Sequence, residues 1–221
     1  MGRSPILTAT QKRFLQLFAQ KSSISDRFYL TGGTALAEFY IPYRLSEDLD
    51  FFSENEIDLG QVTTFIRSVK NNLAYTNLDI STSFNRNLVF LEFGKKETLK
   101  TEFTYFPFPQ IEKPKKINGI LVDSSIDIAV NKLFTIYQKP RSRDFMDLYM
   151  LIKKYNLTLD DIIKKARIKF DWHIDFIQLG TQFMQAQELK DYPLLLVSLE
   201  ENEWQNYFLE KAKSFKENII S

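Results

Sequence analysis

The chain has 221 residues, 44% of them hydrophobic, and its 29 basic side chains almost balance its 28 acidic ones. This balance argues against a general nucleic-acid-binding coat, although it leaves room for a local basic patch. The absence of cysteine excludes disulfides, thiol nucleophiles and zinc–thiolate sites, and a single histidine argues against a Ser-His-Asp triad. No apolar run approaches the roughly 20 residues that span a bilayer, and the N-terminus lacks a signal-peptide core. We therefore expect a soluble cytoplasmic protein without membrane attachment.

The first part of the chain alternates predicted helices and strands. Apolar residues recur at helical spacing after a capping threonine near the N-terminus. Farther on, Leu49 and Phe51 alternate with Asp48 and Asp50, which is typical of a strand with one apolar and one acidic face. In chain order we expect a helix in 8–21, a strand in 27–30, a helix in 34–41, a strand in 45–52 and a helix in 58–73.

Residues 74–106 contain three segments of β-branched and aromatic side chains between polar turns, which predicts an antiparallel meander. The prolines of residues 107–119 predict a loop. Beyond Asp123 helical patterns dominate, and the helices that we expect are 125–139, 143–155, 159–168, 172–189 and 201–219. This organisation predicts an α/β core, residues 1–123, and a helical domain, residues 124–221, that packs on the core.

Asp48 and Asp50 are the first candidates for chemistry. Positions i and i+2 of a strand face the same side, about 7 Å apart, so the two carboxylates repel each other unless a cation lies between them. Mg²⁺ suits such a pair because it needs only one or two carboxylates besides water and phosphate oxygens. The alternative is a solvated acidic face or a turn-capping Asp48, and it would be preferred if the pair stood alone.

Two further features of the sequence favour a binding role for Asp48 and Asp50. Gly32, Gly33 and Thr34 lie between a predicted strand and a predicted helix, where bare backbone N–H groups can bind phosphate. A simple tight turn would also explain the two glycines. Glu102 alternates with Thr101 and Phe103 in a later strand, so it can face the same side as Asp48 and Asp50 if the two strands are neighbours. A glutamate on the polar face of a strand is otherwise usually solvated.

Five segments, in this order, resemble one protein family. "YLTGGTALAEFY" followed by "RLSEDLDFF", then "LKTEFTYFPFP", "DIAVNKL" and "SRDFMDLY", look like the AbiEii/AbiGii-type toxin branch of the nucleotidyltransferases. The resemblance covers roughly residues 28–151. It implies an α+β fold with a polymerase-β-like core, in which a mixed, mostly antiparallel sheet is flanked by helices, and a helical region follows.

The resemblance also implies a nucleotide and metal site in the first half of the chain. The groups that would hold the triphosphate of an NTP are Gly32, Gly33, Thr34 and Ser46. The carboxylates that would bind Mg²⁺ or Mn²⁺ are those of Asp48 and Asp50, with Glu102 as third ligand or general base. Relatives of this kind usually carry aspartate at the position of Glu102, whose side chain is one methylene longer.

Residues of the helical half match the family as well. Lys132 would neutralise phosphate charge, although a single lysine on an amphipathic helix is usually solvated. Asp144 would border the same site, although its place in a first helical turn is already favoured by the helix dipole. Arg143 is a candidate for contacting phosphate or for pairing with a carboxylate.

These observations leave three hypotheses. The first is a Mg²⁺-dependent nucleotidyltransferase that moves a nucleoside monophosphate from an NTP to an RNA such as tRNA, or to a protein. This enzyme would be the toxin of a toxin–antitoxin or abortive-infection system, restrained by an antitoxin protein. The second is a non-catalytic nucleotide-binding module of the same fold that acts through a partner protein. The third is an unrelated α+β domain, which we place last because five motif segments agree in order.

Overall fold

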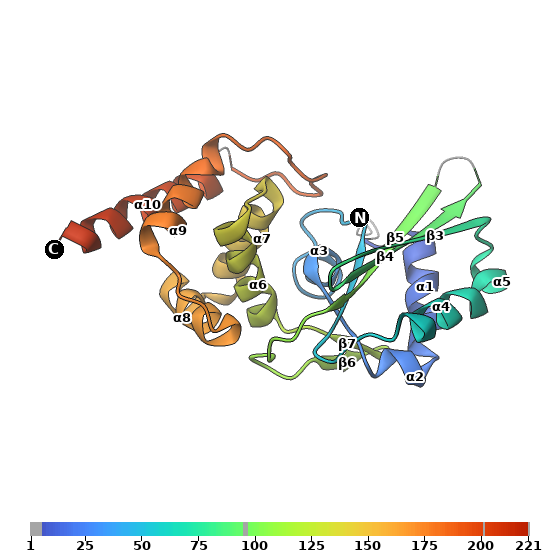
Figure 1. Ribbon diagram of the computed structural model, residues 1–221. Coiled ribbons are helices and arrows are strands. Elements are labelled where there is room, and N and C mark those ends of the chain that lie inside the picture. The colour runs from blue at the N-terminus through green and yellow to red at the C-terminus, as the bar shows by residue number, and fades with distance from the viewer. Residues whose placement is uncertain (1–5, 95–96, 201, 221) are drawn as a thin grey trace. The chain divides into compact units, whose positions relative to one another are not determined.

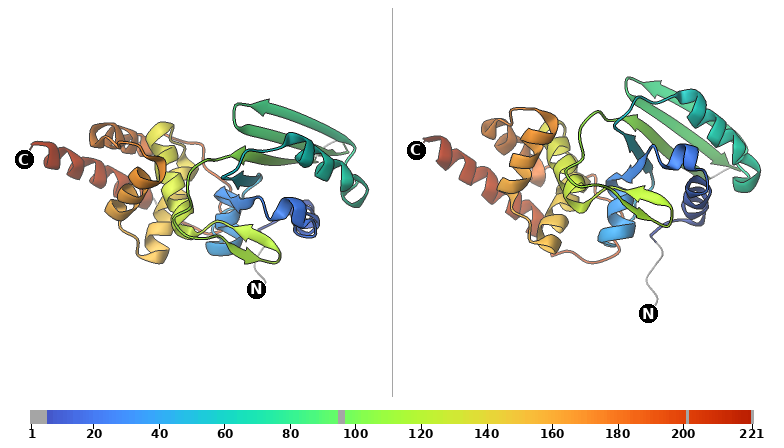
Figure 2. Two further views of the ribbon diagram at one scale, coloured as in Figure 1. Left: turned by 60° about the horizontal axis from the view of Figure 1, so that its bottom comes forward. Right: turned by 90° about the horizontal axis from the view of Figure 1, so that it is seen from below.

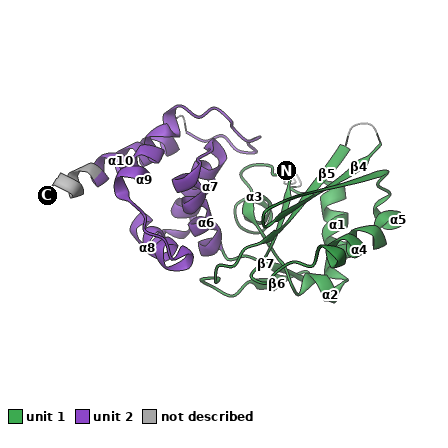
Figure 3. Cartoon of the chain, viewed as in Figure 1, with its two compact units in different colours: residues 1–124 green, residues 125–221 purple. Residues whose placement is uncertain are grey.

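The computed structural model describes residues 6–94, 97–200 and 202–220, and the chain divides into two compact units. Residues 1–124 form the first unit and residues 125–221 the second (Figure 3). The first unit contains all the strands of the sheet, and the second is built from helices (Figure 1). No helix among the described residues combines the length and the apolar character needed to cross a bilayer.

The elements of the first unit follow the predicted order closely. Its helices are α1 Ala9–Ala19, α2 Ser22–Ser25, α3 Gly32–Ala35, η1 Leu36–Tyr40, α4 Leu59–Ser68 and α5 Lys70–Leu73. Its strands are β1 Tyr29–Thr31, β2 Leu49–Ser53, β3 Asn77–Ser83, β4 Arg86–Phe93, β5 Glu97–Tyr105, β6 Lys115–Ile117 and β7 Ile120–Val122. The helix predicted over 34–41 begins at Gly32 and changes from α- to π-helical geometry before it ends.

The strands of the described part of the first unit form one mixed sheet with the order β3-β4-β5-β2-β1-β7-β6. The β3-β4-β5 meander is antiparallel, as predicted, whereas β2 pairs in parallel with β5 and β1 in parallel with β7. The remaining pairs are antiparallel. The mostly antiparallel sheet flanked by helices that the sequence predicted is therefore confirmed.

The loop predicted over residues 107–119 is partly wrong, because β6 lies within it. β6 and β7 form a hairpin in which Ile117 pairs with Ile120. The two turn residues, Asn118 and Gly119, have φ angles of 51° and 83°, and such an Asn-Gly pair is the preferred two-residue hairpin turn. The prolines earlier in the segment favour a loop, whereas the Asn-Gly pair favours a hairpin.

One face of the sheet is covered by α1 and α4 and forms an aromatic core (Figure 2). Phe51 of β2 stacks on Phe103 of β5 with ring centroids 5.2 Å apart, and Phe18 of α1 lies 4.4 Å from Phe51. Phe14 and Phe65 complete the cluster through edge contacts. Because side chains alternate along a strand, burying these rings commits the residues between them to the opposite face of the sheet.

The second unit consists of α6 Ser125–Gln138, α7 Ser142–Tyr155, α8 Leu159–Phe170, α9 Phe176–Met184, η2 Gln185–Gln187 and α10 Glu203–Ile220. The helix predicted over 172–189 begins four residues later than expected. Asp171 ends α8 with a left-handed backbone conformation, and Asp175 caps α9 by accepting a hydrogen bond from the backbone N–H of Gln178. Rings of Phe145, Phe183 and Phe208 pack at the centre of this unit.

The aromatic core generates a prediction for stability. Phe103 is fully buried between other rings, so Phe103→Ala should lower the free energy of unfolding by about 3–5 kcal/mol through lost burial and the cavity left behind. The matched control is Phe84→Ala, because Phe84 is 100% exposed and its removal should cost little. Urea denaturation of both variants checks the pair, and equal losses would contradict the assignment of the core.

Candidate functional site

The register of the sheet brings the candidate carboxylates together on the face opposite the aromatic core. Asp50 of β2 lies directly beside Glu102 of β5 on one side. On its other side, Asp50 lies directly beside Thr31 of β1. The condition attached to Glu102, that its strand be a neighbour of the aspartate strand, is thus met. Residues paired in this way point to the same face of a sheet.

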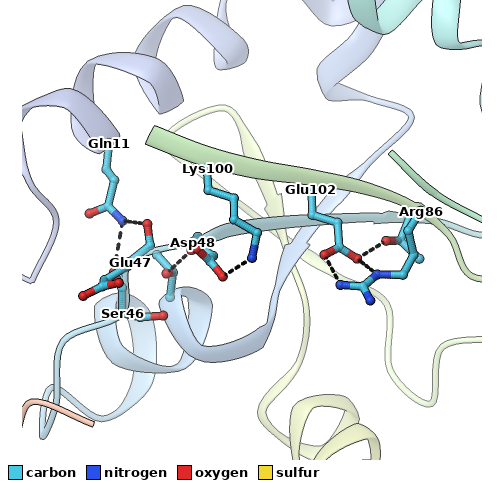
Figure 4. A network of polar contacts seen from close by, with 9 residues as sticks. Gln11, Ser46, Glu47, Asp48, Arg86, Lys100 and Glu102 are labelled. Carbon is cyan, nitrogen blue, oxygen red and sulfur yellow. Dashed lines mark hydrogen bonds and ion pairs between the residues drawn. The ribbon is translucent and has the colours of Figure 1, made fainter. Parts of the chain in front are cut away.

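Asp48 joins this face although it precedes the first residue of β2. Lys100, two residues before Glu102 and therefore on the same face of β5, places its Nζ 2.7 Å from Asp48 Oδ2 (Figure 4). Both side chains of this ion pair are about one-third exposed, at 33% for Lys100 and 31% for Asp48. The ion pair is therefore accessible to solvent, and it consists of one contact from the Lys100 ammonium group to Asp48.

Glu102 is bound more completely. Arg86 donates from Nε to Oε1 and from Nη2 to Oε2, each at 2.6 Å, and Thr104 donates to Oε1 at 2.6 Å (Figure 4). Burial alone would raise the pKa of the Glu102 carboxyl, but the hydrogen bonds from Arg86 and Thr104 and the charge of Arg86 together lower that pKa. Glu102 is therefore a charged, nearly buried group with both oxygens engaged.

The glycine turn fits closely against these residues. A Cβ atom at Gly32 would lie 2.4 Å from Asp50 Oδ2, and one at Gly33 would lie 2.4 Å from Arg44 Nη2 and 2.8 Å from Ser46 Oγ. Gly32 also has a φ of +71°, which side chains rarely adopt. The turn is thus a point where the backbone closely approaches a carboxylate, a guanidinium and a hydroxyl with no side chain between them.

The backbone around Asp48 is fixed from two sides. The hydroxyl of Thr34 donates to the backbone carbonyl of Asp48. The amide nitrogen Nε2 of Gln11 donates to the carbonyls of Ser46 and Glu47 at 3.0 and 2.9 Å (Figure 4). The side-chain hydroxyl of Thr34 therefore positions Asp48, and Ser46 adjoins the glycine turn.

Sequence reasoning missed Arg86 and Lys100 on this face of the sheet, and Gln11 of α1, which contacts the backbone that leads to Asp48. Gln11 had a visible role, since it completes a capping box with Thr8 at the start of α1, but nothing in the sequence pointed to its second set of contacts. Lys100 carried a weak indication, because its spacing of two from Glu102 puts both on one face. Arg86 lay in a predicted turn and gave no indication of its partner.

The second unit holds Lys132 and Asp144 in a buried cluster. Lys132 Nζ lies 2.7 Å from Asp144 Oδ1 and 2.7 Å from Asp147 Oδ2, and both carboxylates are fully buried. Arg141 Nε adds a contact of 2.7 Å to Asp144. Burial would raise the pKa of Asp144, but the charges of Lys132 and Arg141 and their hydrogen bonds lower it.

The position of Lys132 on an amphipathic helix favoured a solvated side chain. That expectation is wrong, since Lys132 is only 8% exposed. Its ammonium group pairs with both of these buried carboxylates, and Arg141 adds a second positive charge at Asp144. Arg143, next to this cluster in sequence, is exposed. The sequence-predicted residues therefore fall into two groups: the glycine turn with Ser46, Asp48, Asp50 and Glu102 in the first unit, and Lys132, Arg143 and Asp144 in the second.

The fit of a divalent cation can be judged from the donor atoms. Asp48 and Asp50 offer the carboxylate oxygens that Mg²⁺ prefers, and Lys100 already shows that Asp48 accepts a cation. Glu102 does not fit a third ligand position as it stands, because Arg86 and Thr104 occupy its oxygens. Accordingly, no three His, Cys, Asp or Glu side chains in the described ranges are arranged to hold one metal ion.

Comparison with known protein families shows to which family the chain belongs. The profile described as nucleotidyl transferase AbiEii toxin, type IV toxin–antitoxin system, matches residues 13–218. The chain belongs to the AbiEii family. The match spans both units, so the family relationship includes the helical half of the chain as well as the sheet.

The chain is also similar to individual proteins. The chain is 29% identical over 200 residues to the uncharacterized protein aq_aa25 of Aquifex aeolicus, covering 88% of this chain and 91% of that one. A crystal structure from H. pylori, provisionally described as a nucleotidyltransferase, has a TM-score of 0.61 at 22% identity, with 96% and 97% of the two chains covered. JHP933 from Helicobacter pylori gives 0.59 at 21% identity, with coverages of 97% and 95%. At these identities the two structures establish the fold.

The first prediction from this site concerns Gly32. Gly32→Ala should be markedly more destabilising than Gly94→Ala, although both glycines have positive φ, because only the Cβ at Gly32 meets a neighbour. Gly94 has no atom within 4 Å of that position, so its substitution should cost only the left-handed conformation, about 1–2 kcal/mol. Thermal or urea unfolding measures both, and equal costs would show that Asp50 does not rest against the turn.

The second prediction concerns Lys132. Lys132→Met should lower the free energy of unfolding of the second unit by about 3–5 kcal/mol, because it leaves Asp144 and Asp147 short of countercharge in a buried site. Lys116→Met is the control, since Lys116 forms an exposed ion pair with Asp26 of a kind worth about 0–1 kcal/mol. Denaturation curves compare the two, and a cost below 1 kcal/mol for Lys132→Met would contradict the buried cluster.

Proposed function

We propose that this AbiEii-family chain is a Mg²⁺-dependent nucleotidyltransferase that moves a nucleoside monophosphate from an NTP to an acceptor. The observation that carries the proposal is the contact between Asp50 and the Gly32–Gly33 turn, beside Asp48 on the same face. It combines carboxylates suited to a cation with bare backbone N–H groups suited to phosphate. The family and the fold support an enzyme of this class.

In the proposed reaction an acceptor oxygen attacks the α-phosphorus of the NTP. The bond from the α-phosphorus to the bridging oxygen of the β-phosphate breaks, pyrophosphate leaves with the bonding electron pair, and the proton of the acceptor hydroxyl passes to water. The metal, when bound, supplies Lewis-acid stabilisation of the charge on the phosphate oxygens. Asp48 and Asp50 hold the metal, and the N–H groups of Gly32 and Gly33 orient the triphosphate.

Glu102 has a different place in this scheme from the one that the sequence favoured. Its lowered pKa and its two-pronged ion pair with Arg86 make it a weak candidate for removing the acceptor proton, since an effective general base needs a pKa near the working pH. Lys132, Asp144 and Arg143 are proposed to serve the same reaction from the helical unit, which would shape the acceptor site.

The type IV toxin–antitoxin description of the family supports two further parts of the proposal. The chain would be the toxin of such a system, with an NTP as substrate and a separately encoded antitoxin as its functional partner. An RNA, tRNA included, or a protein would be the acceptor. Net charge is nearly zero, so recognition of an RNA acceptor would depend on local contacts rather than on a general electrostatic attraction.

One observation favours a second candidate, a non-catalytic nucleotide-binding module of the same fold. With Glu102 bound by Arg86, the described residues present a pair of carboxylates but no triad around one metal position. A module of this kind would bind an NTP and act through a partner protein. Binding without turnover would distinguish it from the enzyme.

Transfer of label from α-labelled NTPs to total RNA and to protein, in the presence of Mg²⁺, tests the proposal. Asp50→Asn should reduce transfer by about 100-fold or more, the scale expected when a group that stabilises transition-state charge is lost. Asp79→Asn is the matched control, because Asp79 is an exposed aspartate in β3 of the same sheet; it should transfer like the unaltered protein.

Each other outcome of that experiment has a defined meaning. Equal transfer by Asp50→Asn and the unaltered protein would place the chemistry elsewhere. NTP binding that Asp50→Asn abolishes, without transfer by any form of the protein, would replace the enzyme by the binding module. Failure to bind any NTP would refute both.

A further inference from the structure

Arg86 of β4 and Glu102 of β5 form an ion pair between two neighbouring strands. This ion pair has no role in the proposed reaction. Arg86 is the first residue of β4 and is paired in register with Thr104, whereas Glu102 is paired with Leu88. The two side chains therefore meet on the diagonal between neighbouring strands, where only long side chains reach each other. The result is a two-pronged contact, with both N···O distances at 2.6 Å.

The pair leaves one edge of the guanidinium open. A guanidinium carries five N–H donors, and Glu102 takes one from Nε and one from Nη2, which leaves three. The Arg86 side chain is 57% exposed, whereas that of Glu102 is 7% exposed. The carboxylate thus lies beneath the arginine, and the remaining donors face solution.

Arg86 also lies within electrostatic reach of the aspartates. The hydrogen bonding of Arg86 to the Glu102 carboxylate raises the pKa of Arg86 most, and the charges of Asp50 and Asp48 raise it further. A nucleotide whose metal rests on Asp48 and Asp50 would bring its phosphate charges into the same neighbourhood. Arginine is suited to receive them, because its planar fork matches the geometry of phosphate oxygens.

We propose that Glu102 is a positioning residue rather than a metal ligand, and that it aims Arg86 so that the free N–H donors of the guanidinium bind a phosphate group of the nucleotide. This inference rests on the proposed function, because it needs an NTP in the site. It accounts for the glutamate: the extra methylene gives Glu102 the length to reach Arg86 on the diagonal, which an aspartate would lack.

The benefit of such an arrangement is pre-organisation. An exposed arginine loses up to about 2 kcal/mol of rotamer freedom when it is immobilised on a ligand. A guanidinium already held by Glu102 and supported by Thr104 has lost most of that freedom before the nucleotide arrives. Lys100 contrasts with it, since its single contact with the partly exposed Asp48 can be exchanged for a divalent cation.

The test separates metal binding from phosphate binding. Mn²⁺ binding without nucleotide is followed by electron paramagnetic resonance, and the binding of an NTP and of the matching nucleoside by calorimetry. The variants are Arg86→Ala, Glu102→Asp and the double variant Arg86→Ala with Glu102→Gln, which leaves no unpaired buried charge. Lys116→Ala serves as the control, because Lys116 lies in the same unit in an exposed ion pair.

The expected loss of NTP binding is the same in all three site variants, about tenfold, the scale of a lost hydrogen bond to a charged group. Nucleoside binding should be unchanged, and Mn²⁺ affinity should stay within about twofold in Glu102→Asp and in the double variant, which keep the net charge of the face. Glu102→Asp is decisive because it keeps the charge and shortens only the reach. Lys116→Ala should match the unaltered protein.

Three results would overturn the inference. Loss of Mn²⁺ binding in the double variant, with unchanged or tighter binding in Glu102→Asp, would show that the carboxylate at position 102 is a metal ligand. Unchanged NTP affinity in Arg86→Ala would show that the guanidinium does not contact phosphate. An unaltered protein that binds neither Mn²⁺ nor NTP would refute the proposed function itself, which distinguishes that failure from the other two.

Discussion

The site is organised by the need to neutralise three carboxylates on one face of a sheet. Asp48, Asp50 and Glu102 carry three negative charges at neighbouring positions, and the adjacent Lys100 and Arg86 return two positive ones. Like charges at such spacings raise each other's pKa unless cations intervene. The bare Gly32 backbone beside Asp50 would face the phosphates of a bound nucleotide.

The two cations satisfy this constraint in different ways. Lys100 holds one oxygen of Asp48 from a position partly open to solution, so a metal can take its place. Arg86 fills both oxygens of a nearly buried carboxylate and is therefore fixed. Lys132 and Arg141 show the same logic in the helical unit, where together they balance Asp144 and Asp147. A charge-balanced cluster of this kind keeps buried carboxylates ionised and in place without a ligand.

Periodicity was enough to predict much of the fold and part of the site. The alternation of Asp48 and Asp50 with buried neighbours fixed their common face, and the meander that ends in β5 brought Glu102 beside Asp50. What could not be predicted depends on contacts distant in sequence. Gln11 meets the Ser46–Glu47 backbone from another element, and Arg86 finds Glu102 only through the strand register. The burial of Lys132 likewise follows from packing that a single helix does not reveal.

The most direct measurement is anomalous diffraction from crystals grown with Mn²⁺ and a non-hydrolysable NTP. The account predicts a manganese peak bound by Asp48 and Asp50, phosphate oxygens at the Gly32–Gly33 turn and at Arg86, and an intact Arg86–Glu102 ion pair. A peak bound to Glu102 with Arg86 displaced would contradict the role given to this pair. Nucleotide density away from the glycine turn would contradict the site as a whole.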